Sequence, residues 1–474
     1  MTGTVGLAAL EARVAHDLET LCWSGGDFTA PRAHAEGHVY DVVIVGGGQS
    51  GLAAAFGLRR ERVSNVLVID ENPAGYEGPW ATYARMITLR TPKELTPLDY
   101  GIPSLTFRAW WEAQHGAAGW AAVDKIPRGD WMAYLRWYRR VLDLPVRNEA
   151  KLAAIEPVEP GLFRLHIAGA APLLARKVVL ATGIQGGGEW HTPDFIKALP
   201  RHLYAHTSEP VDLEALKGKR IGILGGGASA FDNANCLLEH GAGAVEVFIR
   251  RKELPRINPI RFMERVGLAA RYPALDDDAK VRAIAAFLSH NQPPTNDTFN
   301  RAASRPGFAL RLGEPWLEVA ETAEGQVRVT TPLATHVFDF LLLSTGLISD
   351  PALRPELRLV ADAIACWRDR AGGTGHALID AHPDLGPAFE FRVKPGADPA
   401  RIHGLFAFNY SALVSLGLSA SALSGLRTAL PRLCAGVADQ LFLDDAEANL
   451  AAFIDYAEPE FLGQWPLPVQ EAAA

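Results

Sequence analysis

The stretch YDVVIVGGGQSGLAAA, Tyr40 to Ala55, decides the fold, and KRIGILGGGASAFDNA, Lys219 to Ala234, repeats its pattern. In each, an apolar run typical of a buried parallel strand enters a glycine-rich turn that opens a helix. The first glycine makes the turn, the second lets a ligand approach the backbone, and the third position packs helix on strand. Two such turns predict two sites for a dinucleotide pyrophosphate, each at a helix N-terminus.

The candidate ligand-binding residues follow from these two turns. In the first turn they are Gly46, Gly48, Ser50 and Gly51. In the second turn they are Gly225, Gly227, Ser229 and Ala230. Each helix leads to another apolar strand, NVLVID or AVEVFIR, which completes a β-α-β unit. We therefore predict an α/β fold with two Rossmann-like dinucleotide-binding domains.

The residues that end the second strand of each unit distinguish the two sites. Asp70, followed by Glu71, ends the first, and a carboxylate there accepts hydrogen bonds from an unphosphorylated ribose. Arg250 and Arg251 end the second, where guanidinium groups can bind a 2′-phosphate. This difference predicts FAD in the first site and NADPH in the second. The alternative is that the two arginines are solvated surface charges.

Composition narrows the function classes. The 474 residues carry a formal net charge of −8, which argues against a nucleic-acid partner. The four cysteines, Cys22, Cys236, Cys366 and Cys434, show neither a C-x-x-C pair nor zinc-ligand spacing, so we predict no metal site. Scattered thiols and the lack of a signal-peptide pattern favour the cytoplasm.

Helical segments flank the two units. Residues 1–38 are predicted to form an amphipathic helical extension, and Gly129 to Val141 a further helix. The aromatic-rich stretch from Trp80 to Pro127 is expected to be mainly core. The uncharged run Leu405 to Leu426 is long enough to span a membrane, but its serines and glycines favour a buried strand, a turn and a helix start.

The chain resembles the class B flavin monooxygenases, which include flavin-containing, Baeyer–Villiger and N-hydroxylating enzymes. The resemblance covers nearly the whole chain from Tyr40, and the matching motifs are GGGQSG, VLVID, GPW (78–80), LRTPKEL (89–95), VVLATG (178–183), YAHTSEP (204–210), GGGASA and LLLSTG (341–346). It implies an FAD domain made of residues 39–205 and 335–474. An NADPH domain, 206–334, is inserted between these parts and itself carries a helical insertion, 255–310.

The resemblance also implies the chemistry. NADPH would reduce FAD, O2 would add at the flavin C4a, and the (hydro)peroxyflavin would transfer one oxygen atom to a small organic substrate. Two alternatives stay open: an NADPH-dependent oxidoreductase of the pyridine nucleotide–disulfide reductase type, and a flavoprotein that senses NADPH without catalysis. The implied partners are the substrate and O2, and a homodimer is left open.

Further site residues come from the matched motifs. Trp80, Thr182 and Gly183 lie in motifs expected beside FAD, and Asn409 precedes a helix whose positive end is expected to face the flavin. Arg90 occupies the place of a flavin-side Asn, where it would contact the oxygenated flavin, the substrate or an FAD phosphate. His206 alone matches the Baeyer–Villiger fingerprint F-x-G-x-x-x-H, either in proton transfer or in orienting the interdomain linker.

Overall fold

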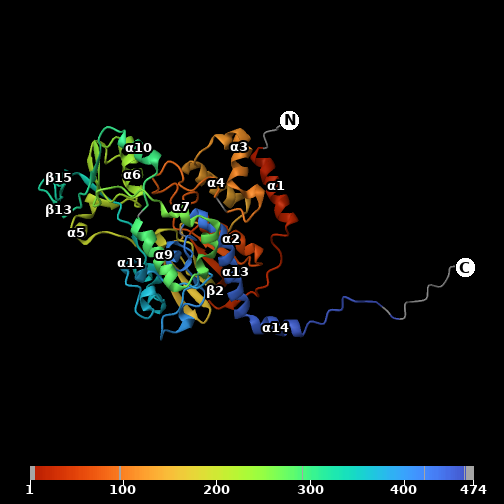
Figure 1. Ribbon diagram of the computed structural model, residues 1–474. Coiled ribbons are helices and arrows are strands. Elements are labelled where there is room, and N and C mark those ends of the chain that lie inside the picture. Colours follow the sequence, from red (N-terminus) through yellow and green to blue (C-terminus); the bar gives the residue numbers. More distant parts are fainter. Residues whose placement is uncertain (1–5, 96–97, 291, 421, 464, 466–474) are drawn as a thin grey trace.

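The computed structural model describes residues 6–95, 98–290, 292–420, 422–463 and 465, and two sheets with parallel central strands dominate it (Figure 1). The predicted segments 1–38 and 335–474 include residues outside these ranges. The first sheet has the strand order β4-β3-β2-β7-β6-β5, with β1 paired to β2 and β18 to β7. Its strands are β1 (Ala33–His34), β2 (Gly37–Val45), β3 (Val66–Ile69), β4 (Val146–Arg147), β5 (Leu152–Glu159), β6 (Leu162–Ile167), β7 (Leu173–Leu180) and β18 (Leu405–Phe406).

The centre of this sheet is parallel and buried. Strands β2, β3, β4, β7 and β18 run parallel to one another. Strand β6 pairs antiparallel with both β7 and β5. Val42, Val43 and Ile44 of β2 are fully buried because helices cover the sheet. Helix α2 (Gln49–Arg60) packs against α13 (Leu426–Asp444) beside it. The glycine turn therefore sits at the carboxyl edge of the sheet, where open α/β sheets bind their ligands.

The second sheet is entirely parallel, with the order β12-β11-β10-β16-β9. Its strands are β9 (Tyr204–His206), β10 (Arg220–Leu224), β11 (Ala244–Ile249), β12 (Phe308–Leu312) and β16 (Phe340–Leu343). Helix α6 (Ala228–Glu239) follows the second glycine turn, and α10 (Asn296–Ala303) packs on it. A separate apolar core, which includes Ile221, Ile223 and Phe231, holds sheet and helices together.

The predicted boundary between residues 334 and 335 is wrong for strand β16. Strand β16 was assigned to the second part of the FAD domain, but it pairs with β10 and with β9 in the second sheet. Strand β9 likewise lies across the predicted boundary between 205 and 206. An apolar run such as Phe340–Leu343 carries no local signal of which sheet it joins, because its pairing partners lie far away in sequence.

Smaller elements fill the edges. The additional strands form two antiparallel sheets: β13 (Glu318–Glu321), β14 (Val327–Thr330) and β15 (Thr335–Phe338) in one, β8 (Glu189–Trp190) and β17 (Leu347–Ile348) in the other. The smaller elements also include the short helices and 3-10 turns α5 (Asp194–Lys197), η1 (Pro103–Leu105), η2 (Gln185–Gly187), η10 (Tyr410–Ala412) and η11 (Leu423–Gly425).

The predicted N-terminal helix is confirmed as α1 (Leu7–Thr20), which buries Leu10 and Val14 against η1 and α3 (Phe107–Ala122). The predicted helix near residue 130 is confirmed as α4 (Arg128–Val141). Most rings of the aromatic-rich stretch pack between these helices, as expected for core: Phe107 lies within 6.3 Å of Trp110, Trp111, Trp120, Trp131 and Tyr134, measured between ring centroids.

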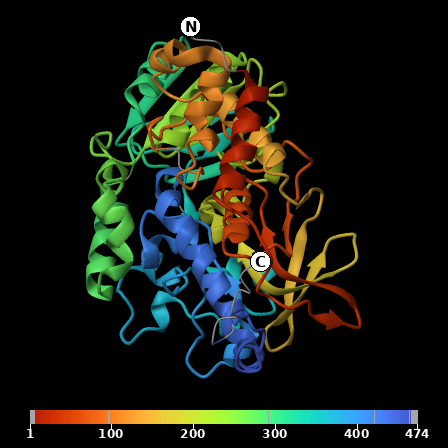
Figure 2. The same ribbon diagram turned by 90° about the vertical axis from the view of Figure 1, so that its right-hand side faces the viewer.

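Helices from the middle of the chain bridge to its C-terminal part. They are α7 (Pro259–Met263), α8 (Val266–Arg271) and α9 (Asp277–His290). Met263, Tyr272 and Ile284 share a buried cluster with Trp367 and Leu413, close to α11 (Ala377–Ala381) and α12 (Leu413–Leu416). Figure 2 shows this helical segment beside α13. None of the helices among the described residues is long and apolar enough to cross a membrane.

Candidate active site

The first glycine turn is built as a ligand cradle. Gly46 has φ +107°, and a Cβ there would overlap the carbonyl oxygen of Ala181. A Cβ at Gly51 would overlap the carbonyl oxygen of Gly46. Helix α2 begins after Gly48 with no side-chain cap, so its first N–H groups are available to a phosphate. The turn thus fits the FAD pyrophosphate, and Ser50 is buried in the first turn of the helix.

Asp70 lies at the end of β3 beside this turn. Its carboxylate accepts hydrogen bonds from the Gly47 N–H at 2.7 Å and from the backbone and side chain of Asn72 at 2.8 and 3.0 Å. Burial raises the pKa of Asp70. Glu71 is exposed and forms a 3.0 Å ion pair with Lys151, so only Asp70 faces the cradle.

Trp80 and Gly78 lie on the loop that follows. Gly78 has φ +73°, and its Cα lies 3.6 Å from the position a Cβ would take on Gly48, so the two glycines leave the turn open. Trp80 is half-buried against the core, and its carbonyl accepts a 2.9 Å hydrogen bond from Arg128. Trp80 therefore lies near the cradle but anchors the loop to α4.

Asn409 joins the end of β7 and the residues that follow it to η10. Its side-chain amide donates to the carbonyl of Leu180 at 3.3 Å and to the hydroxyl of Thr182 at 3.2 Å. Its side-chain oxygen accepts from the N–H and hydroxyl of Ser411, at 3.0 and 2.7 Å, and the Tyr410 N–H donates to Gly183. The Asn409 side chain is occupied within the protein, and it caps η10 rather than pointing freely at a ligand.

The second glycine turn repeats the cradle with one difference. Gly225 has φ +109°, and a Cβ there would overlap the carbonyl oxygen of Ser344. Helix α6 begins after Gly227, again with no side-chain cap, and Ser229 lies in its first turn. Ala230 is fully buried, and its methyl group packs in the second core where the first turn needs Gly51.

The two arginines at the end of β11 separate in space. Arg250 is exposed and forms no ion pair within the described part of the chain. Arg251 is half-buried, and its guanidinium donates to the carbonyl of Ser289 at the end of α9, at 3.0 Å. Arg250 is thus available to a 2′-phosphate, whereas Arg251 anchors α9.

Arg250→Ala should raise the KM for NADPH about tenfold or more and leave NADH nearly unchanged, since a charged hydrogen bond contributes about 1.5–3 kcal/mol. Steady-state oxidation of both nucleotides measures this. Arg251→Ala is the matched control and should affect the two nucleotides equally. An equal loss with both nucleotides in Arg250→Ala would contradict the assignment of this residue.

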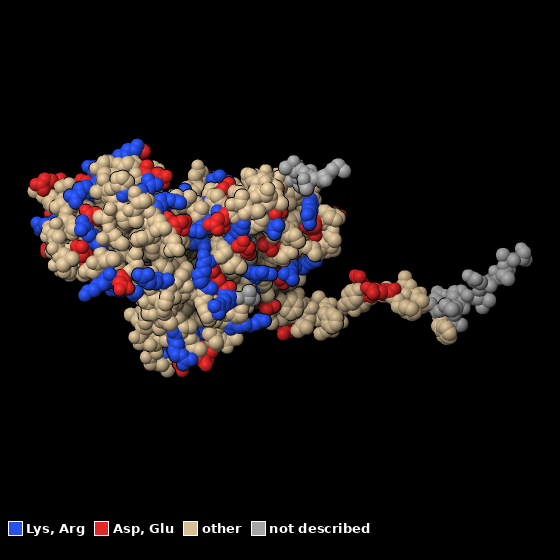
Figure 3. Space-filling model, turned by 45° about the horizontal axis from the view of Figure 1, so that its top comes forward, with Lys and Arg blue, Asp and Glu red and all other residues tan. Residues whose placement is uncertain are grey.

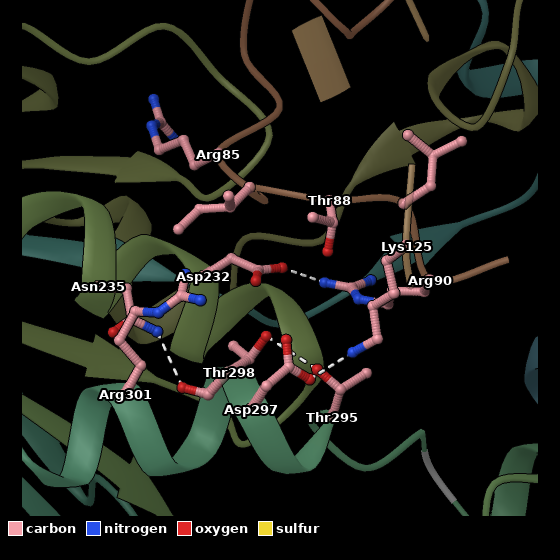
Figure 4. A pocket seen from close by; sticks show the side chains of 12 residues that line it. Arg85, Thr88, Arg90, Lys125, Asp232, Asn235, Thr295, Asp297, Thr298 and Arg301 are labelled. Carbon is pink, nitrogen blue, oxygen red and sulfur yellow. Dashed lines mark hydrogen bonds and ion pairs between the residues drawn. The ribbon is translucent and has the colours of Figure 1, made fainter. Parts of the chain in front are cut away.

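Arg90 lies between the two dinucleotide units (Figure 4). Its guanidinium pairs with the carboxylate of Asp232 on α6, and its carbonyl accepts a 3.0 Å hydrogen bond from Arg261. Asp232 is buried, and burial raises its pKa although Arg90 acts in the opposite direction. The sequence predicted that Arg90 contacts the oxygenated flavin, the substrate or an FAD phosphate. The structure adds a partner within the protein that was not predicted, the carboxylate of Asp232.

Arg85 was not among the site residues predicted from the sequence. It donates to the carbonyls of Thr207 and Glu209 at 2.9 and 2.7 Å, and to the side-chain oxygen of Asn233 at 2.7 Å. Burial lowers the pKa of its guanidinium, which still stays charged at neutral pH. Arg85 therefore joins the loop after Trp80 to the interdomain linker and to α6, and no local motif marks an arginine of this kind.

His206 lies in β9 on that linker. Its ring stacks on Trp190 with centroids 4.6 Å apart, and Nδ1 accepts a 3.2 Å hydrogen bond from the Ser208 N–H. Burial lowers the pKa of His206 to about 4. A neutral, stacked imidazole fits the linker-orienting alternative better than proton transfer.

Because His206 is buried in its neutral form, we expect acid to lower the stability of the fold. The unfolded chain binds a proton at His206 near pH 6.5 but the folded chain only near pH 4, so stability falls as pH falls through that window. Lowering the pH from 7.5 to 5 should cost wild type about 2 kcal/mol more than His206→Phe, which keeps a ring on Trp190. Urea unfolding of both proteins at the two pH values measures this difference. Equal acid losses in both would contradict it.

A pocket opens where the two units meet (Figure 4). Four cations lie around it, against two carboxylates, and Lys125 pairs with Asp297 while Asn235 donates to the Thr298 carbonyl at 2.9 Å. Its lining residues are Arg85, Ile87, Thr88, Leu89, Arg90, Lys125, Asp232, Asn235, Thr295, Asp297, Thr298 and Arg301. The cavity between these side chains is about 10 Å³, which is room for one water molecule, and its cations outnumber its carboxylates.

None of the cysteines lines this pocket, although Cys236 lies close enough to Arg85 and Asp232 for electrostatic interaction. Cys366 and Cys434 are buried, and burial raises the pKa of each thiol to about 12. Cys236 lies on α6, where burial also raises its pKa. All four cysteines are free. No pair of thiols suited to disulfide exchange is found within the described ranges.

Comparisons with known proteins identify the family. A family described as FAD-NAD(P)-binding matches residues 43–185, and L-lysine 6-monooxygenase/L-ornithine 5-monooxygenase matches residues 120–271. The FAD-dependent urate hydroxylase of Xanthomonas campestris pv. campestris is 60% identical over 474 residues, which cover 99% of this chain and 100% of that protein. The chain belongs to the family of this hydroxylase. It is an FAD-dependent monooxygenase that uses NADPH and O2.

Solved structures agree on the fold. Ornithine hydroxylase from Pseudomonas aeruginosa matches 85% of this chain and 100% of its own at 18% identity, with a TM-score of 0.68. L-lysine 6-monooxygenase from Pseudomonas syringae matches 85% and 99% at 18% identity, with a TM-score of 0.65. At this identity the likeness concerns the fold alone. These structures confirm the α/β fold. Together with the family matches and the 60% identical relative, they confirm the resemblance to class B flavin monooxygenases and both cofactors.

Proposed function

We propose that this monooxygenase hydroxylates urate. The observation that carries the proposal is the end-to-end match, at 60% identity, to a protein named as an FAD-dependent urate hydroxylase. One oxygen atom of O2 would enter urate and the other would leave as water, with two electrons from NADPH and one proton. Bound FAD supplies the electron transfer between NADPH and O2.

The charge of the side chains where the two units meet supports an anionic substrate, which needs the units to separate there because the cavity itself is about 10 Å³. Urate is a flat anion at neutral pH that carries several carbonyl and N–H groups. Arg85, Arg90, Lys125 and Arg301 surround the pocket, against Asp232 and Asp297. A surplus of cations attracts an anion and repels the ammonium group of a diamine or diamino acid. This favours urate over N-hydroxylation of lysine or ornithine, the second candidate that the family match at residues 120–271 raises.

We assign the cofactor contacts from the cradles described above. FAD would lie on the first glycine turn with its ribose at Asp70. Thr182 and Gly183, which follow the end of β7, would flank the cofactor. NADPH would lie on the second turn with its 2′-phosphate at Arg250. Arg85 and Arg90, which join the two units, would hold them so that the nicotinamide meets the flavin and water is excluded.

We also propose that the enzyme works in the cytoplasm, where NADPH is maintained and free thiols such as Cys22, which is exposed, stay reduced. Cell fractionation followed by immunoblotting tests this. Recovery of the protein outside the cytoplasmic fraction would contradict it.

Substrate-dependent turnover tests the function. With purified holoenzyme, urate should accelerate NADPH oxidation at least about tenfold, and one atom of 18O from labelled O2 should appear in the product by mass spectrometry. Lysine and ornithine are run in parallel. Stimulation by either amino acid and not by urate would establish N-hydroxylation instead. Oxidation of NADPH to give only H2O2 with every substrate would establish an NADPH oxidase.

A further inference from the structure

Residues 446–463, called the arm below, leave the body of the protein (Figure 1). The arm begins with α14 (Ala446–Ile454), which buries none of its residues. Every residue from Leu450 to Gly463 is exposed. The arm and the adjoining residues nevertheless carry large apolar side chains: Phe442, Leu443, Leu450, Phe453, Ile454, Tyr456, Phe461, Leu462 and Trp465.

Exposed fractions this high are unusual for large apolar side chains on a surface that contacts only water. Phe453 and Ile454 are 76% and 77% exposed, and Phe461 is 87% exposed. Single exposed apolar side chains need no explanation, but a contiguous set of this size marks an interaction surface. We therefore expect that another surface covers the apolar side chains of the arm.

The base of the arm is fixed. Only Asp445 separates α13 from α14, and Arg176 holds its carboxylate at 2.9 Å. Lys177, which is fully buried, pairs with Asp444 at 2.7 Å. These buried cations on β7 hold the joint between the two helices. The arm therefore points away from its own body, and a surface on another molecule is easier for it to reach than its own.

The charge of the arm indicates what that surface carries. The arm contains Glu447, Asp455, Glu458 and Glu460, and no Lys or Arg follows Arg432 in the chain. A partner should therefore combine basic and apolar side chains. Acidic and apolar residues alternate along the arm, so it does not favour an anionic membrane surface or a nucleic acid.

This chain has such a surface, which we call the basic strip. It consists of Arg261 on α7, Arg265 before α8, Arg271 at the end of α8, and Arg427 and Arg432 in the first part of α13. Arg265 stacks over the exposed ring of Phe262 at 4.3 Å, and Arg432 donates to the Ala270 carbonyl at 3.2 Å. Arg261 pairs with Glu264 at 3.0 Å, whereas no ion pair within the described ranges joins Arg265, Arg271 or Arg427 to a carboxylate. Figure 3 shows Lys and Arg side chains gathered on the body of the protein from which the arm extends.

The dimensions allow an exchange of arms. Helix α14 and the extended residues after it reach about 40 Å from the joint. The basic strip lies about 26 Å from the joint, at the other end of α13. A two-fold axis across α13 would place the arm of each copy over the basic strip of the other. We propose that the arm docks on the basic strip of a second copy of this chain, which forms a dimer by mutual exchange.

Charge reversal tests this arrangement on the full-length holoenzyme. Sedimentation equilibrium should give a dimer for wild type, and both the chain ending at Asp445 and the R265E/R271E variant should be monomers. The E458R/E460R variant should also be a monomer. In each variant the dimer dissociation constant should rise at least about a hundredfold. Glu324→Arg, on an exposed turn between β13 and β14, is the matched control and should leave the dimer intact.

A mixture of the two reversed variants gives the sharpest result. Each variant alone sets like charges against each other, but in a mixed dimer both arm-to-strip contacts again join opposite charges. Equimolar E458R/E460R and R265E/R271E should therefore form a one-to-one heterodimer. A mixture that stays monomeric, a monomeric wild type, or a chain ending at Asp445 that still dimerises would overturn the proposal.

Discussion

Gly51→Ala should yield a protein that is purified without its yellow cofactor, with the affinity for FAD reduced at least about a hundredfold, or roughly 3 kcal/mol. A methyl group at this position overlaps the carbonyl oxygen of Gly46, the residue that forms the turn itself. Either the turn opens or α2 moves away from β2, and both changes displace the N–H groups that face the pyrophosphate. Titration of the apoprotein with FAD, followed by flavin fluorescence, measures the loss.

Two controls separate this effect from a general loss of stability. A Cβ at Gly129, at the start of α4, meets no atom within 4 Å, so Gly129→Ala should bind FAD normally. Ala230→Gly changes the corresponding residue of the second turn, where a methyl group already fits, and should leave FAD binding unchanged. Wild-type FAD affinity in Gly51→Ala would show that the first turn does not bind this cofactor.

The contrast between these two turns shows what the sequence could predict. Glycines and apolar strands are local signals, so the sequence indicated both cradles, both cofactors and the order of the two units. It also indicated that Asp70 and Arg250 end equivalent strands. Each of these features depends on residues within one β-α-β unit, where spacing along the chain fixes spacing in the fold.

The contacts between the units could not be predicted in the same way. Arg90 and Asp232 are 142 positions apart, and Arg85 and Asn233 are 148 apart. Their pairing depends on how two separately folded units sit against each other, and no periodicity or motif records that. The same limit explains the misassigned strand β16 and the protein-bound side chain of Asn409.

Arg90→Ala should lower kcat/KM for urate about a hundredfold, roughly 3 kcal/mol, and divert NADPH oxidation to H2O2. The substitution removes a cation from the pocket and breaks the ion pair that joins the loop after Trp80 to α6. It also leaves the buried Asp232 carboxylate without its cation, which should lower the free energy of unfolding by about 2 kcal/mol. Urate-dependent NADPH oxidation, a peroxide assay and urea unfolding measure the three effects.

The pH dependence distinguishes the broken ion pair from a simple loss of packing. Burial raises the pKa of Asp232 and Arg90 lowers it, so removal of Arg90 should raise the folded-state pKa further above that of the unfolded chain. A raised carboxyl pKa means that stability is lost as pH rises from the unfolded pKa through the folded pKa, so the defect of Arg90→Ala should grow as pH rises from acid towards neutral, which urea unfolding over a pH series measures.

The double variant Arg90→Met/Asp232→Leu should recover most of the stability but not the coupling of NADPH oxidation to urate, because the pocket still lacks its cation. Arg401→Ala, which breaks the exposed pair with Asp362, is the matched control and should cost less than about 1 kcal/mol. Unchanged stability and coupling in Arg90→Ala would mean that the pair with Asp232 neither joins the two units nor orders the pocket. The positive charge needed for urate would then have to come from Arg85, Lys125 or Arg301, each of which can be replaced in turn.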